Sequence, residues 1–216
     1  MYELEKKVVD ALNPLLKSRG FVWSKSREMY IRKKPWGFHC LLWSCYDVDP
    51  AGTLELRLVI GVRHNDVDDI VNRLGIIYGD DNKKYTTTVS RSLAFFPFEK
   101  IEGIQHIKVD SATTDIAVFV GKVLNIVEGV GDGFYQKYST VMECSRGLNF
   151  PIDVISHHLC NNFPNRAYYG VACAMLAEPD RVPELAKQYV EFATVAKIGN
   201  TSKITEKIYK LLSFFG

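Results

Sequence analysis

Residues 54–62 read LELRLVIGV, and this stretch decides the fold class. Apolar side chains occupy every second position from Leu54 to Val62, while Glu55 and Arg57 stand between them. Successive side chains of a strand point to opposite faces, so the period of two predicts a strand that buries one face and exposes the other. This alternation is typical of an antiparallel sheet.

The residues before this strand predict a helix and further strands. Residues 2–17 place apolar side chains at helical spacing, and Gly20 follows where a helix is expected to end. Short strands separated by turns are then expected at residues 21–23, 29–33 and 38–46. Residues 76–108 show no regular apolar period, so we make no firm assignment of helices or strands to them.

A second helix is expected directly after the alternating strand. Asn65 is a suitable N-cap, and three acids follow it in the first turn, Asp66, Asp68 and Asp69. Three neighbouring carboxylates also fit acid/base or magnesium chemistry. The helix macrodipole explains acids in a first turn without a ligand, so we interpret them as capping residues.

Beyond residue 110 the apolar period changes from two to about 3.6, which predicts consecutive helices. The segments at residues 116–127, 182–193 and 204–215 each carry one apolar stripe, and residues 166–177 predict a small-residue helix. The glycines at positions 129, 131 and 133 are interpreted as a turn that ends a helix.

These patterns predict an α+β protein with an N-terminal antiparallel sheet covered by helices, followed by a helical C-terminal half. The change of period predicts an α/β subdomain at 1–108 and a helical subdomain at 109–216, or one single body.

Composition and charge exclude several classes of protein. The chain has 216 residues, 47% of them hydrophobic, which is too apolar for a disordered protein. A net charge of +2 lacks the excess of basic residues typical of nucleic-acid binders. The sequence shows neither a signal peptide nor an apolar run that could span a membrane, so we expect a cytoplasmic protein with reduced cysteines.

Histidines and cysteines gather twice, as His39, Cys40 and Cys45 and as His157, His158 and Cys160. Both residue types bind zinc, but neither group has the CxxC spacing of a structural site, and each would offer two ligands on one face at best. We therefore predict no metal and no cofactor.

One hairpin mixes basic and aromatic side chains. Arg32, Lys34 and Trp36 are the residues expected to bind a partner, because such a mixture can hold an acidic protein surface or stack on bases. The competing interpretation is a solvated hairpin whose aromatic residues face the core.

Residues 12–21, LNPLLKSRGF, followed by Tyr30-Ile31-Arg32 and by a strand ending in Gly61-Val62, resemble the opening of uncharacterised bacterial α+β domains. Some members of that family are thought to be immunity proteins that neutralise toxins. The resemblance covers the first third of the chain and implies a binding role, without assigning any residue to it.

Since no catalytic constellation is assembled in the sequence, we expect a non-enzymatic protein-binding module, an immunity or accessory protein. The alternative is an enzyme of unknown reaction, with a pocket between sheet and helices that uses His157, His158, Cys160 or His39. A nucleic-acid binder would show affinity that falls steeply with salt. The sequence leaves the partner and the formation of homo-oligomers open.

Overall fold

The computed structural model describes residues 3–26, 28–48, 53–75, 83, 86–92, 107–110, 115–160 and 162–214. The chain forms two compact units. The first comprises Met1–Gly61 and Arg91–Gln136, and the second comprises Val62–Ser90 and Lys137–Gly216. Each unit therefore combines two separate segments of the chain. The predicted boundary between residues 108 and 109 would instead divide the chain into two continuous halves.

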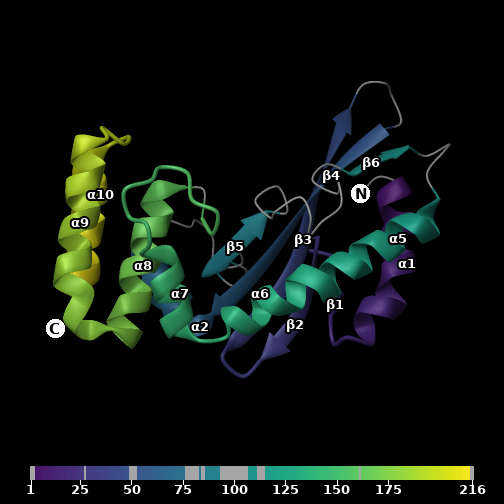
Figure 1. Ribbon diagram of the computed structural model, residues 1–216, viewed down its shortest axis with the longest axis horizontal. Coiled ribbons are helices and arrows are strands. Elements are labelled where there is room, and N and C mark those ends of the chain that lie inside the picture. The colour runs from purple at the N-terminus through teal and green to yellow at the C-terminus, as the bar shows by residue number, and fades with distance from the viewer. Residues whose placement is uncertain are drawn as a thin grey trace. The chain divides into compact units, whose positions relative to one another are not determined.

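The α+β class predicted from the sequence is confirmed. Among the described residues, six strands form one sheet: β1 (Val22–Ser24), β2 (Met29–Lys34), β3 (Gly37–Val48), β4 (Thr53–His64), β5 (Val89–Ser92) and β6 (Ile107–Asp110). Their order is β1-β2-β3-β4-β5, and β6 also pairs with β4 (Figure 1). The β1–β2, β2–β3 and β4–β6 pairs are antiparallel.

The helical C-terminal half is confirmed as well (Figure 1). Within the described residues the helices are α1 (Glu3–Lys17), α2 (Asn65–Asn72), α5 (Ile116–Ile126), α6 (Asp132–Lys137), α7 (Val141–Leu148), α8 (Phe163–Ala177), α9 (Val182–Val195) and α10 (Thr201–Leu212). A 3₁₀ turn, Pro179–Arg181, joins α8 to α9. In the part of the chain described here, no helix combines the length and hydropathy needed to cross a membrane.

The first unit packs α1 and α5 side by side (Figure 1). Val8, Leu12 and Leu16 are buried on α1, at the helical spacing seen in the sequence. The Tyr30 hydroxyl of β2 donates a hydrogen bond of 3.1 Å to the Val9 carbonyl, which connects α1 to the sheet.

The second unit is built around α8. Its residues from Arg166 to Met175 are all buried, and α2, α7, α9 and α10 pack against it. A helix that is covered on every side shows no polar face, which explains its weak amphipathic pattern.

The glycine series lies inside a continuous helical stretch, so the predicted helix-ending turn is wrong. Helix α5 passes through a π-helical segment, Val127–Gly131, directly into α6. Each glycine costs a helix about 1 kcal/mol relative to alanine. Burial of Val127, Val130 and Phe134 on the same stretch offsets that cost.

Candidate functional site

The candidate site is the β2–β3 hairpin, where Arg32 acts as an internal brace. Its guanidinium lies 4.5 Å from the ring centroid of Phe21 and 5.1 Å from that of Tyr135. The same group forms an ion pair of 3.1 Å with Asp132 at the start of α6. Two aromatic faces and one carboxylate therefore hold the strand against the helical part of its own unit.

His39 is the cross-strand neighbour of Arg32 and accepts its hydrogen bonds. Arg32 Nε and Nη2 lie 3.2 and 3.1 Å from His39 Nδ1. Arginine can only donate, so Nδ1 carries a lone pair and the imidazole proton lies on Nε2. The ring stacks on Tyr135 with centroids 4.6 Å apart, and Tyr135 donates to the Cys40 carbonyl at 2.8 Å.

The three predicted binding residues lie at the margin of this cluster. Arg32 and Lys34 are two positions apart on β2 and so share a face, while Lys33 between them points to the other face. Trp36, in the turn, lies 5.4 Å from the His39 ring, centroid to centroid. Arg32 is thus engaged internally and its side chain is only 20% exposed, whereas Lys34 and Trp36 are half-buried at the edge.

Lys33 and Lys34 differ from Arg32 in their charge environment. Asp132 neutralises Arg32, but neither lysine forms an ion pair among the described residues. The hairpin therefore presents positive charge beside a half-exposed indole. The binding role of Arg32, Lys34 and Trp36 stays a prediction.

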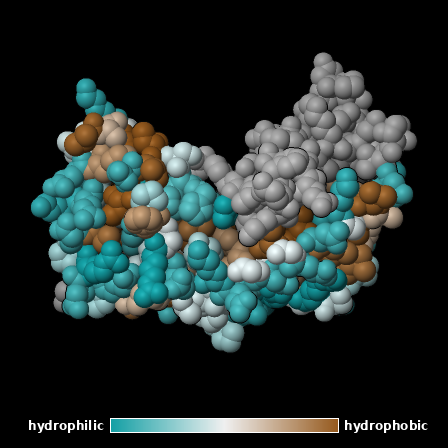
Figure 2. All heavy atoms as spheres, in the orientation of Figure 1, coloured by the Kyte–Doolittle hydropathy of each residue, from teal (hydrophilic) through white to brown (hydrophobic). Residues whose placement is uncertain are grey.

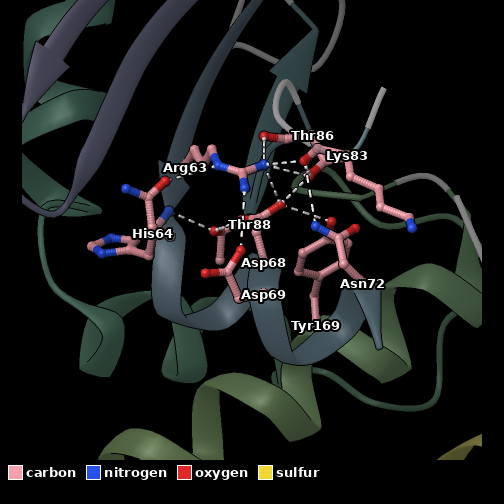
Figure 3. A network of polar contacts seen from close by, with 10 residues as sticks. Arg63, His64, Asp68, Asp69, Asn72, Lys83, Thr86, Thr88 and Tyr169 are labelled. Atoms are coloured by element: carbon pink, nitrogen blue, oxygen red, sulfur yellow. Dashed lines mark hydrogen bonds and ion pairs between the residues drawn. The ribbon is translucent and has the colours of Figure 1, made fainter. Parts of the chain in front are cut away.

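A second polar cluster is buried in the other unit (Figure 3). Arg63, at the end of β4, pairs with Asp68 of α2 at 3.2 Å, and their side chains are 5% and 0% exposed. The hydroxyls of Thr86, Thr88 and Tyr169 all donate to the Asp68 carboxylate, those of Thr88 and Tyr169 at 2.6 and 3.0 Å. One carboxylate thus connects four segments of the unit, namely the end of β4, α2, residues 86–88 and α8.

Burial raises the pKa of the Asp68 carboxyl above its ordinary value, and Arg63 and the three hydroxyls offset only part of that rise. Burial also raises the pKa of Tyr169 well above its ordinary value, so Tyr169 remains a donor. A carboxylate with no exposed surface cannot meet a substrate, so the network holds the unit together. The interpretation of Asp68 as a capping residue is therefore wrong.

The reason for that error is visible in α2. The helix begins at Asn65 with His64 at the N-cap position, and Asn65 Oδ1 accepts from Arg63 Nε at 3.0 Å instead of capping the helix. An arginine five residues before an aspartate was the available signal, but only tertiary burial distinguishes this pair from a surface pair.

His157, His158 and Cys160 lie in the loop between α7 and α8, not on a helix. Leu159 N–H donates to His157 Nδ1 at 3.2 Å, so the Nε2 proton donates to the Phe150 carbonyl, also at 3.2 Å. The Cys160 thiol donates to the Asn162 carbonyl, and burial raises the pKa of that thiol. A raised pKa lowers the thiolate fraction and hence the nucleophilicity at neutral pH. The enzyme hypothesis stays a prediction.

Thiol reactivity is expected to follow burial. Cys144 and Cys173 have no exposed surface, and burial raises the pKa of both thiols. We expect maleimide at pH 7 to leave both unlabelled in the folded chain and to label both in urea, as read by peptide mass mapping. Half-buried Cys160 serves as the internal comparison and is expected to react before them. Labelling of Cys144 at the rate found in urea would contradict the buried assignment.

Among the described residues, no group of three His, Cys, Asp or Glu side chains is arranged to hold a metal ion. Comparison with protein-family models, with curated proteins and with solved structures finds no match. The resemblance to toxin-immunity domains therefore stays a prediction.

Proposed function

We propose that this chain is a non-enzymatic protein-binding module whose contact surface includes Lys34 and Trp36. The Arg32 brace is the observation that carries the proposal. It fixes the hairpin through Phe21, Tyr135 and Asp132 before a partner arrives. A surface ordered in advance loses less conformational entropy on binding.

The chemistry of this surface favours an acidic protein segment. Lys34 has no carboxylate partner among the described residues. An Asp or Glu side chain of the partner could therefore form an ion pair with Lys34 without displacing another carboxylate. Trp36 adds a half-exposed aromatic ring, the type of side chain most often found at energetic centres of interfaces. Neutralisation of a toxin, the role implied by the resemblance, would act through such a surface.

The proposal predicts selective binding to acidic peptides. On an array of Asp- and Glu-rich peptides, the wild-type chain is expected to bind several members. It is expected not to bind the same sequences when Asn replaces each Asp and Gln replaces each Glu. Lys34→Glu should weaken binding about tenfold or more, because it replaces attraction by repulsion at the contact. Binding should also weaken as salt is raised.

Lys33→Glu is the matched control, since it reverses the same charge one residue away on the opposite face of β2. We expect it to change affinity much less than Lys34→Glu does. Equal effects of the two variants would show a diffuse charge effect and contradict the assigned surface. Equal binding of the acidic peptides and of their Asn- and Gln-substituted forms would contradict an acidic partner.

A further inference from the structure

The loop between α7 and α8 exposes large apolar side chains. Within residues 149–160, here called the 149–160 loop, Phe150 is 78% exposed and Ile155 is 56% exposed. Figure 1 shows this loop at the upper end of α8, and Figure 2 shows hydrophobic residues in that region among hydrophilic ones. Isolated exposed apolar residues are common, but here two lie five positions apart within one short and ordered loop.

A buried arginine holds the backbone of this loop. Arg166 of α8 has no exposed surface, and its guanidinium donates to three carbonyls of the loop. The acceptors are Pro151 at 3.3 Å, Ile152 at 2.6 Å and Val154 at 2.7 Å. These carbonyls lie between Phe150 and Ile155, so one side chain fixes the spacing of the two apolar residues.

Further hydrogen bonds hold both ends of the loop. His157 connects the Phe150 carbonyl to the Leu159 amide, and the Leu159 carbonyl accepts from Ser90 N–H at 3.1 Å. At the other end, buried Asn149 donates to the Gly170 carbonyl at 3.1 Å. The loop is therefore fixed from α8, from β5 and from within itself.

We propose that the 149–160 loop is a second interaction surface, which inserts Phe150 and Ile155 into an apolar pocket of a partner protein with a basic rim. The loop contains no Lys or Arg. Its exposed acid, Asp153, is attracted by buried Arg166 but forms no ion pair among the described residues. A basic rim would supply that pair. An anionic membrane surface attracts basic segments and so fits this loop poorly. In a symmetric contact between two copies, the Asp153 carboxylates would repel one another.

This inference goes beyond the proposed function, because the hairpin belongs to the other unit and takes a partner of opposite charge. The test places a photo-crosslinking phenylalanine analogue at position 150, or at Val195 as control, in cells that produce the chain naturally. Val195 is 81% exposed and lies in the same unit, on α9. We expect a protein adduct at position 150 that is absent at position 195 and persists in the Lys34→Glu variant.

The protein in that adduct is then purified and titrated with variants of the full chain. Phe150→Ala should raise Kd about tenfold or more, and Val195→Ala should leave it unchanged. Arg166→Lys keeps the charge but cannot reach three carbonyls, so a folded Arg166→Lys chain should also bind several-fold more weakly.

Several outcomes would overturn the inference. These are the same adducts at both positions, an adduct with a second copy of the chain, an adduct with lipid, or no adduct at position 150. An unchanged Kd for Phe150→Ala would overturn it too. Loss of peptide binding by Lys34→Glu with an intact adduct at position 150 separates this inference from the proposed function.

Discussion

Replacement of Asp68 with alanine is expected to lower the free energy of unfolding by about 3–5 kcal/mol, the usual cost of removing one partner of a buried ion pair. The variant leaves the Arg63 guanidinium, 5% exposed, without its buried carboxylate. It also removes the acceptor of the Thr88 and Tyr169 hydroxyls. Urea unfolding followed by far-UV circular dichroism measures the effect.

Asp69→Ala is the matched control for this prediction. Asp69 is the next residue on α2 and lies 3.8 Å from the same Arg63, but its side chain is 68% exposed. Water screens such a pair, so the expected loss is below about 1 kcal/mol. A loss for Asp68→Ala no greater than that for Asp69→Ala would show that Arg63 finds another partner, and would contradict the central role of Asp68.

Gly170→Ala is expected to destabilise the chain by about 2–4 kcal/mol, through overpacking and the loss of buried hydrogen bonds. An added Cβ would overlap with Asn149 Oδ1 and would lie 2.7 Å from the Tyr189 hydroxyl oxygen. Those two atoms form a hydrogen bond of 2.8 Å with each other, so the methyl group must displace both partners. The gain in helix propensity, about 0.5–1 kcal/mol, is too small to offset this cost.

Gly121→Ala provides the control, because Gly121 lies within α5 and, among the residues that the structure describes, no neighbouring atom lies within 4 Å of its added Cβ. Here the gain in helix propensity is unopposed, so the free energy of unfolding should rise by up to about 1 kcal/mol. If Gly170→Ala were also stabilising in urea unfolding, Asn149 and Tyr189 would have to repack without loss, against the expectation for a close-packed helix.

The two proposed surfaces have opposite character. The hairpin offers positive charge with an indole, while the 149–160 loop offers apolar side chains with one acid. Each surface is supported by an arginine that contacts groups within the same unit. This residue is Arg32 for the hairpin and Arg166 for the 149–160 loop. Arginine suits this role because its planar fork reaches several acceptors or stacks on rings.

Periodicity identified much of the fold correctly. The alternation at residues 54–62 and the helical stripes on α1, α5, α9 and α10 reflect local rules, since each side chain's face is set by its position in the repeat. Local signals failed where a feature depends on what packs against it. The glycines at 129, 131 and 133 did not end a helix, because buried neighbours on the same stretch hold it.

Sequence by itself determined the α+β class, the antiparallel meander and the succession of helices, because secondary structure follows from side-chain spacing along a single segment. Only the tertiary structure decided the roles of individual charges. It paired Arg63 with Asp68 inside one unit, used Arg32 as a brace beside Tyr135, and turned Arg166 toward loop carbonyls. The energy of a charge depends on its burial and partners, and those come from segments far apart in the chain.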